Sequence, residues 1–491
     1  MFRCKKPHVP FSAGKVHPDS NRLVGIAWLL LALLALAPAR LRADPAAPSP
    51  KSYRDLAWEC YWKGDYTNAI TNFSKAILEN PQDAWAYNYR ALSKEYAGDL
   101  TGALADYKTA ANINPDYAEV YVNCGQLLQW YSNKLSIAIA DYTEAIRLEP
   151  TNANTFTIRA GAYLRQTNFD QALSDYNMAI QLQPTNAMVW KGRGDFFKRM
   201  TNHDAAILDY TKCIQLEPAN ADYYAFRARA ETAAAKGSPK NGDQKKADDY
   251  LHRSLDDWHR AVALNSSYLT GLGTFECQQG KYDQGIADFT KYIQMYPTNV
   301  TGLNLRAFAF ERMAEEEAKR GELAAKEAAL DKALADWNHL ISMDVHLLCE
   351  RGGFYARNNQ YAKALADYRK AVELQPTSKY TLLEKAWFLA TCPDPGYRDG
   401  PQALAAANKA ITMGLGYDSE WFDLSCLAAA YAETGDFAQA VKFQKQALQK
   451  LGEEDKQNGA LISETQDWLT LYERGQPCHK MPGLDVVFDW N

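Results

Sequence analysis

The sequence lacks the short motifs on which most enzymes and metal sites are built. Its nine cysteines form no Cys-x-x-Cys pair, and it has no Gly-rich phosphate loop and no Gly-x-Ser-x-Gly elbow. His252, Asp256 and His259 share one helical face, but isolated triples of this kind are usually surface residues. We therefore predict no catalytic residue, no metal and no cofactor, and expect that the protein is not an enzyme.

The body of the chain also lacks an excess of positive charge. Residues 1–43 carry seven Lys or Arg and one Asp, so the net charge of −5 combines +6 there with −11 in the remainder. Nucleic acids and anionic lipid surfaces are bound by basic patches. We expect no nucleic acid partner, and no membrane contact beyond the N-terminal segment.

Only one long uncharged apolar run occurs, at residues 23–37 (LVGIAWLLLALLALA). Basic residues precede it and a small residue, Ala43, follows, as in a secretory signal. We predict a signal peptide at residues 1–43, a Pro-rich spacer at 44–50 (DPAAPSP) and an exported protein, periplasmic or secreted. The run is short for a membrane span, which needs about 20 apolar residues. An uncleaved anchor through residues 23–37 is left open because the preceding segment is unusually long.

The rest of the chain is dominated by one repeated spacing: Ala, three residues, an aromatic, two residues, a small residue, four residues and Pro. Full copies end at Pro81, Pro115, Pro150, Pro184, Pro218 and Pro376, and the first five are 34, 35, 34 and 34 residues apart. Spacings of three and four place the small and aromatic side chains on one helical face. The Pro then ends the helix. The pattern predicts an array of packed helix pairs.

This pattern resembles the tetratricopeptide repeat family, whose unit is a 34-residue helix–turn–helix. The resemblance covers residues 51–453 and implies an all-α, right-handed superhelical solenoid of about eleven repeats, with protein or peptide ligands held on a concave face lined by first helices. We divide this region into five regular repeats (51–220), duplicated long–short pairs (221–378) and two C-terminal repeats (379–453). Residues 454–491 are predicted as a capping helix and a tail.

Two of the repeats are longer than the others. Trp258 and Trp337 lie 79 residues apart, which indicates duplication of a two-repeat block, and each copy gains a charged, helix-favouring stretch at 231–250 or 314–332. We predict helical hairpins that protrude from the solenoid. They are either solvated spacers or arms that dock a partner. Residues 392–400, rich in Pro and Gly, predict an ordered turn.

Opposite charges recur at fixed positions of the repeat. Arg occurs in first helices at 90, 159, 193, 227, 306 and 351, and Asp precedes the aromatic of second helices at 106, 141, 175, 209, 257, 288, 336 and 367. The pattern favours a ladder of ion pairs between packed helices. The alternative is that the Arg side chains meet carboxylates of a partner in the groove.

Eight cysteines follow the leader at scattered helical positions. Several replace core alanines, which favours buried free thiols, although a disulfide is left open.

Taken together, these features predict an exported scaffold or adaptor that binds peptide or helical segments of other proteins. The alternative is an accessory or regulatory subunit of a cell-envelope enzyme supplied in trans. Candidate partner-binding residues are the polar and aromatic ones on first helices: Asn88, Tyr89, Asn123, Tyr224, Asn304 and Arg306. The oligomeric state is not predicted.

Overall fold

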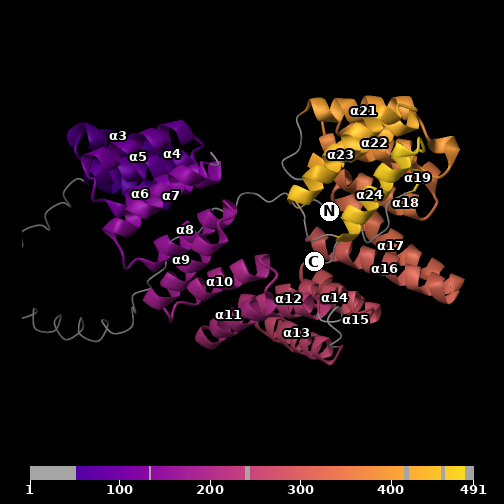
Figure 1. Cartoon of the computed structure of the whole chain (residues 1–491), viewed down its shortest axis with the longest axis horizontal. Coiled ribbons are helices and arrows are strands. Elements are labelled where there is room, and N and C mark those ends of the chain that lie inside the picture. The colour runs from indigo at the N-terminus through magenta and orange to yellow at the C-terminus, as the bar shows by residue number, and fades with distance from the viewer. Residues whose placement is uncertain (1–50, 132–133, 238–243, 414–419, 455–458, 481–491) are drawn as a thin grey trace, which may run out of the picture. The chain divides into compact units, whose positions relative to one another are not determined.

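The computed structural model describes residues 51–131, 134–237, 244–413, 420–454 and 459–480 (Figure 1). The predicted signal peptide, the spacer at 44–50 and the end of the predicted tail lie outside the described residues. Within the described ranges every regular element is a helix, and eleven helix pairs are followed by one further helix. The all-α repeat fold is therefore confirmed.

The chain divides into two units, which are described separately. The N-terminal unit holds residues 51–219 with 233–237, and the C-terminal unit holds 220–232 and 244–480. Helices of the first unit are α2 (Tyr53–Trp62), α3 (Tyr66–Glu79), α4 (Ala84–Tyr96), α5 (Leu100–Ile113), α6 (Ala118–Tyr131), α7 (Leu135–Leu148), α8 (Ala153–Arg165), α9 (Phe169–Leu182), α10 (Ala187–Arg199) and α11 (His203–Leu216).

The C-terminal unit begins with α12, whose last residues belong to the first unit. Its helices are α12 (Ala221–Gly237), α13 (Gln244–Leu264), α14 (Leu269–Gln278), α15 (Tyr282–Met295), α16 (Val300–Arg320), α17 (Leu323–Met343), α18 (Leu348–Arg357), α19 (Tyr361–Leu374), α20 (Lys379–Thr391), α21 (Gly400–Thr412), α22 (Glu420–Glu433), α23 (Phe437–Glu454) and α24 (Gly459–Glu473), with short 3-10 turns at Ser266–Tyr268, Val345–Leu347 and Pro395–Tyr397.

Each repeat is held together where its small and aromatic residues cross. The stripe of the second helix is buried in every regular repeat, as in Ala69, Phe73 and Ala76 of α3. A small residue of the first helix lets the aromatic ring approach, and at Gly125 an added Cβ would lie 2.6 Å from the ring of Tyr142. Within each unit, successive helices pack against one another, and first helices of neighbouring repeats also touch, for example α4 with α6.

Most of the described turns between paired helices contain a residue with left-handed φ. Gly64, Gly98, Gly280 and Gly435 have φ of 76°, 88°, 73° and 86°, as expected for glycines that break the chain there. Three other repeats place Thr167, Thr201 and Asn359 at the same turn with φ of 62°, 56° and 58°. Left-handed φ is costly for a β-branched side chain, so the two threonines are strained.

The added stretches of the duplicated block lie in long helices. α16 and α17 have 21 residues each, against 10 and 14 in α14 and α15, and Gly321 joins them with φ of 80°. α13 also has 21 residues. Their role as spacers or as docking arms stays a prediction.

The C-terminal end is closed by a well-bonded turn and the final helix. Arg398 donates from Nη1 to the carbonyl oxygens of Cys392 and Pro393 at 2.9 and 3.1 Å, so the turn predicted at 392–400 is ordered. α24 packs on α23, and its Trp468 lies 4.9 Å from Trp387, centroid to centroid. No helix in the described ranges has the length and apolarity needed to cross a membrane.

Candidate protein-binding site

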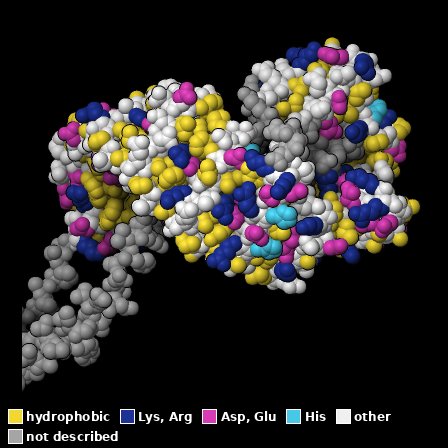
Figure 2. Space-filling view, turned by 60° about the horizontal axis from the view of Figure 1, so that its bottom comes forward, with side chains coloured by type: hydrophobic (Ala, Val, Ile, Leu, Met, Phe, Trp, Pro, Cys, Tyr) yellow, Lys and Arg dark blue, Asp and Glu magenta, His cyan; other side chains and the backbone are white. Residues whose placement is uncertain are grey.

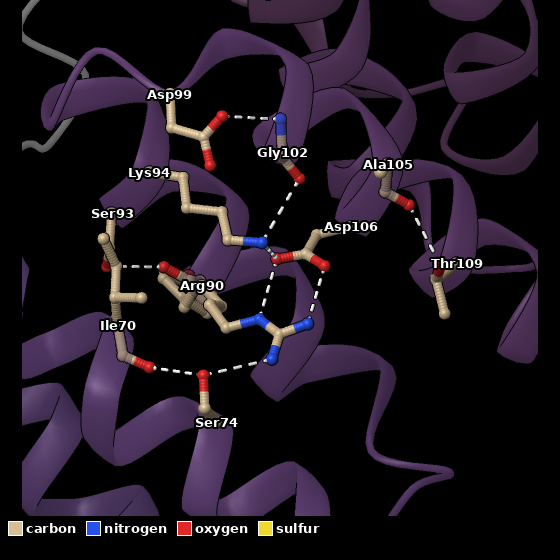
Figure 3. A network of polar contacts seen from close by, with 11 residues as sticks. Ile70, Ser74, Arg90, Ser93, Lys94, Asp99, Gly102, Ala105, Asp106 and Thr109 are labelled. Carbon is tan, nitrogen blue, oxygen red and sulfur yellow. Dashed lines mark hydrogen bonds and ion pairs between the residues drawn. The ribbon is translucent and has the colours of Figure 1, made fainter.

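The recurring charges of the repeats form ion pairs between the two helices of a repeat. Arg90 of α4 donates from Nε and Nη2 to both carboxylate oxygens of Asp106 in α5, at 2.8 and 2.7 Å, and Lys94 Nζ lies 2.8 Å from the same carboxylate (Figure 3). Both side chains of the Arg–Asp pair are largely buried. A guanidinium that bonds a carboxylate through two parallel bonds fixes the angle and register between the helices.

The same two-bond pair recurs in five further repeats with N–O distances of 2.7–2.8 Å. The pairs are Arg159–Asp175, Arg193–Asp209, Arg227–Asp257, Arg306–Asp336 and Arg351–Asp367. The predicted arginine ladder is therefore confirmed.

Five of the six ladder arginines also reach back to the preceding repeat. Arg90 Nη1 donates to Ser74 Oγ of α3 at 3.1 Å (Figure 3). The acceptor is always the residue after the core aromatic of the previous second helix: Ser74, Thr143, Asn177, Thr290 and Asn338, bonded by Arg90, Arg159, Arg193, Arg306 and Arg351. One side chain thus ties together three helices from two repeats, a contact that the sequence pattern did not predict.

Two aspartates of the pattern have no arginine partner among the residues that the structure describes. Cys124 stands in the arginine position opposite Asp141, and one carboxylate oxygen of Asp141 is buried without a hydrogen bond. Burial raises the pKa of Asp141, and the Cys124 thiol and Lys108 oppose this only in part. Leu272 stands opposite Asp288, which instead pairs with Lys291 of its own helix at 2.7 Å.

All eight cysteines of the described chain are free thiols, and seven of them are buried. Burial raises the pKa of Cys213 and Cys277 to about 12, so these thiols are unreactive core residues. This agrees with the sequence interpretation. Among the residues that the structure describes, no three His, Cys, Asp or Glu side chains gather as a metal site would require.

The structure brings three of the predicted partner-binding residues together. The Asn123 amide donates to Asn88 Oδ1 at 3.1 Å, and Asn88 donates to the Tyr117 hydroxyl at 3.4 Å. The Tyr89 hydroxyl donates to Glu119 Oε1 at 2.9 Å, and Tyr117 donates to Glu119 Oε2 at 3.0 Å. Burial and the neighbouring Glu119 raise the pKa of Tyr89, so its hydroxyl keeps its proton.

The other predicted residues lie in the C-terminal unit, on α12 and α16. Tyr224 is buried. Asn304 is also buried, and its Oδ1 has no hydrogen-bond partner in the described chain. The guanidinium of Arg306 is bonded to Asp336 and Thr290. Partner binding by these six residues stays a prediction, and for Arg306 it would require sharing a side chain that already holds the repeat.

Seven rings at the start of the N-terminal unit form one connected surface, here called the aromatic patch. Its members are Trp58, Tyr61 and Trp62 of α2, Tyr66 of α3, and Trp85, Tyr89 and Tyr96 of α4. Trp58 is central, with ring centroids of Trp62, Trp85 and Tyr89 at 5.4, 5.1 and 4.8 Å. Hydrophobic side chains gather in several areas on the surface of this unit (Figure 2).

The aromatic patch remains open to solvent although its rings pack together. Trp62 is 60% exposed and Tyr96 is 42% exposed, while the other five members are partly buried. Large aromatic rings that are left exposed in a cluster, rather than singly, mark interaction surfaces.

Sequence reasoning found only Tyr89 among these seven residues. A usable signal was present, because Trp58, Tyr61 and Trp62 lie at i, i+3 and i+4 on one face of a first helix. Trp85 and Tyr89 repeat this spacing in the next first helix. The second helices carry aromatic residues that are more numerous and strictly periodic. These core aromatics dominate the sequence pattern, so the spacing of the first-helix aromatics is easily overlooked.

Family models match four parts of the chain. A TPR repeat model matches residues 96–129, and three tetratricopeptide repeat models match residues 127–187, 190–220 and 345–378. No curated protein is detectably similar in sequence.

Similar solved structures cover about half of this chain. The C-terminal part of a TPR repeat-containing protein from Cytophaga hutchinsonii is 19% identical, covers 52% of this chain and 98% of its own, and has a TM-score of 0.40. A tetratricopeptide repeat protein from Parabacteroides merdae is 16% identical over 57% and 100%, with a TM-score of 0.38. PilW, a type IV pilus biogenesis factor, is 20% identical over 45% and 96%, with a TM-score of 0.37.

The assignment rests on the chain's own repeats. Nine of the eleven described helix pairs carry an aromatic residue in the stripe of the second helix, and the family models match both units. The chain belongs to the tetratricopeptide repeat family as a multi-repeat member.

Proposed function

We propose that the protein is an exported interaction scaffold that binds peptide or helical segments of other proteins on the face of its first helices. Repeats of this family build protein-binding scaffolds, and catalytic chemistry is no part of this proposal. The aromatic patch carries the proposal, because it leaves Trp62 and Tyr96 exposed within one cluster of seven packed rings.

The aromatic patch differs from the arginine–aspartate ladder in its charge and in its packing. The ladder arginines face the second helices and are occupied by aspartates, so they hold the fold. The patch rings project from first helices and from the start of α3, and no core requires the exposed face of Trp62. Truncation of an exposed ring should therefore cost binding but not stability.

Export rests on the apolar run at residues 23–37 and the basic residues before it. Cleavage after Ala43 would release a chain that begins at Asp44. Sequencing the N-terminus of the protein purified from its native cells tests this directly. A retained N-terminus in the membrane fraction would support the anchor instead.

Photo-crosslinking in the native cell tests the binding face. A photoreactive amino acid is placed at Trp62 in the aromatic patch, at Leu78 on the second helix of the same repeat, and at Leu323 on the long helix α17. Leu78 and Leu323 are 80% and 66% exposed and serve as matched surface positions. Mass spectrometry of the crosslinked products then identifies the neighbour.

We expect one protein neighbour captured from Trp62 and none from Leu78. Capture from Leu323 alone would favour the long helices as docking arms. If the captured protein is an envelope enzyme whose activity depends on this chain, the accessory-subunit role replaces simple scaffolding. Equal capture from all three positions, or none, would contradict binding at the first-helix face.

A further inference from the structure

We propose that α14 is a pH-sensitive element of the C-terminal unit, which stays packed on α15 while the buried carboxyl group of Glu276 holds a proton and lifts away when that group ionises. Such an element responds to pH whatever partner the chain binds. Its basis is a reversal of charge in the α14–α15 repeat, together with the loss of the bonds that hold other first helices in place.

In the α4–α5 repeat, two cations of the first helix neutralise the ladder aspartate. Arg90 and Lys94 lie one turn apart on α4, and they approach the carboxylate of Asp106 to 2.7 and 2.8 Å. The carboxylate is buried, so these two partners offset the cost of taking its charge out of water.

The α14–α15 repeat reverses this arrangement. Leu272 and Glu276 of α14 occupy the places of the two cations, while the ladder aspartate is kept as Asp288. The cation that bonds Asp288 is Lys291, at 2.7 Å, from a largely exposed side chain of the same helix. A second carboxylate thus faces the ladder aspartate where the α4–α5 repeat has two cations.

Glu276 is buried without a bond that would hold its charge. It is 7% exposed, and its Oε2 atom has no hydrogen-bond partner in the described chain. The charges that act on it are Asp288 and Lys291 of α15 and Lys281 of the turn between α14 and α15. Within the described residues, α13 and α16 also contact α14 but contribute no charge to it. Burial and Asp288 raise the pKa of Glu276 to about 7, so it ionises near neutral pH.

The tether that a ladder arginine provides is missing from α14. Such an arginine bonds the second helix of its own repeat and, in five repeats, the second helix of the preceding one. Leu272 can make neither bond. The backbones of α14 and α15 nevertheless cross closely, since an added Cβ at Gly285 would lie 2.6 Å from the carbonyl oxygen of Gly273. Ionised Glu276 gains hydration once α14 leaves this crossing, which favours the opened state.

Glu231 offers a matched comparison in the preceding repeat. It holds the same position on α12 as Glu276 holds on α14, it is 2% exposed, and burial and Asp257 raise its pKa to about 7. The ladder arginine is present there, because Arg227 donates to both carboxylate oxygens of Asp257 at 2.7 Å. We therefore assign the response to α14 and not to α12.

Alkylation of the native cysteines tests the inference on the purified chain. Cys277 follows Glu276 in α14 and is buried, so its thiol reacts only when α14 opens. The references are two buried thiols in repeats with a complete ladder pair, Cys213 of α11 and Cys349 of α18. The protein meets iodoacetamide briefly at several values between pH 5 and 8.5, and mass spectrometry of the digest gives the rate at each cysteine. The ratio of two such rates cancels the pH dependence that thiols share.

We expect the rate at Cys277, relative to the rates at Cys213 and Cys349, to rise about tenfold between pH 5.5 and 7.5 and then to level off. Over this range the packed state holds a proton that the opened state has released. Glu276→Gln should remove the rise, because its amide has no proton to lose. Glu231→Gln is the control variant and should leave the rise intact.

A constant ratio across this range, or a rise that persists in Glu276→Gln, would overturn the inference. An equal rise at Cys349 would show that the whole C-terminal unit unfolds, and loss of the rise in Glu231→Gln would show that the response is not specific to α14. Either of these results would also contradict a pH response confined to α14.

Discussion

Cys124 stands beside Asp141 at the position where, one repeat earlier, Arg90 bonds Asp106. The ladder carboxylate is kept in this repeat but its guanidinium is missing, and burial raises the pKa of Asp141 as a result. The residue that would receive the third bond is Lys108 instead of a hydroxyl or an amide. The third repeat thus contains a partly buried aspartate, Asp141, without the arginine that pairs with the equivalent aspartate in other repeats.

This difference predicts opposite outcomes for two equivalent substitutions. Asp106→Asn removes the partner of Arg90 and Lys94 and should lower the free energy of unfolding by about 2–4 kcal/mol, because breaking a buried pair strands a charge. Asp141→Asn removes a poorly compensated charge and should leave stability unchanged or raise it by up to about 1 kcal/mol. Urea denaturation followed by circular dichroism measures both. Equal losses in the two variants would mean that the arginine adds nothing to the ladder.

Glu276 predicts a pH dependence of stability. Burial and the nearby Asp288 raise its pKa from 4.5 to about 7 in the folded protein, against the effects of Lys281 and Lys291. Between these two pKa values the folded state holds a proton that the unfolded state has released. The contribution of Glu276 is therefore full below pH 4.5 and falls as the pH rises to about 7.

The variant Glu276→Gln mimics the protonated side chain at every pH. It should match the wild type near pH 4.5 and exceed it by about 2 kcal/mol at pH 7.5. Unfolding is followed in urea at both values. The exposed Glu79→Gln is the control and should show no such gain; an equal gain there would remove Glu276 as the cause.

The close helix crossing at Gly125 predicts that an added methyl group is costly. Its Cβ would lie 2.6 Å from the Tyr142 ring, so Gly125→Ala should lose about 1–3 kcal/mol. Gly161, also inside a first helix, has nothing within 4 Å of an added Cβ. Gly161→Ala should gain about 0.5–1 kcal/mol from helix propensity. A gain in stability in both variants would show that the helices at Gly125 move apart at little cost to hold the added methyl group.

The strained turn at Thr167 predicts a stabilising glycine. Thr167→Gly should raise the free energy of unfolding by about 0.5–1 kcal/mol, because relief of the left-handed strain exceeds the entropy cost of glycine. Thr151 lies in a neighbouring turn and is not left-handed. Thr151→Gly should lower stability slightly, and a loss in both variants would show that Thr167 is not strained.

Most of the fold could be predicted because each repeat has its own regular spacing of small and aromatic residues. The spacing of Ala69, Phe73 and Ala76 determines which face of α3 is buried, and Pro81 ends the helix. Repetition then removes the ambiguity that a single amphipathic helix would leave. The long repeats were visible from the 79-residue offset between Trp258 and Trp337.

The site could be predicted only in part. The repeat pattern predicts Asn88, Tyr89 and Asn123 as members of one face, and the structure places them in one hydrogen-bond network. Which aromatics stay exposed depends on the neighbouring helices and not on periodicity. Trp62 and Tyr66 adjoin the turn between α2 and α3, where the spacing rule of either helix alone does not apply.

The backward bonds of five ladder arginines make the ladder a set of couplings between neighbouring repeats. Arrays of repeats open in blocks whose size depends on such couplings. The coupling is missing at the α5–α6 contact, where Cys124 stands, and at the α13–α14 contact, where Leu272 stands. In the N-terminal unit, hydrogen exchange should therefore resolve two cooperative segments, α2–α5 and α6–α11. The segment that carries the aromatic patch could then loosen and refold around a ligand while the rest of the unit stays closed.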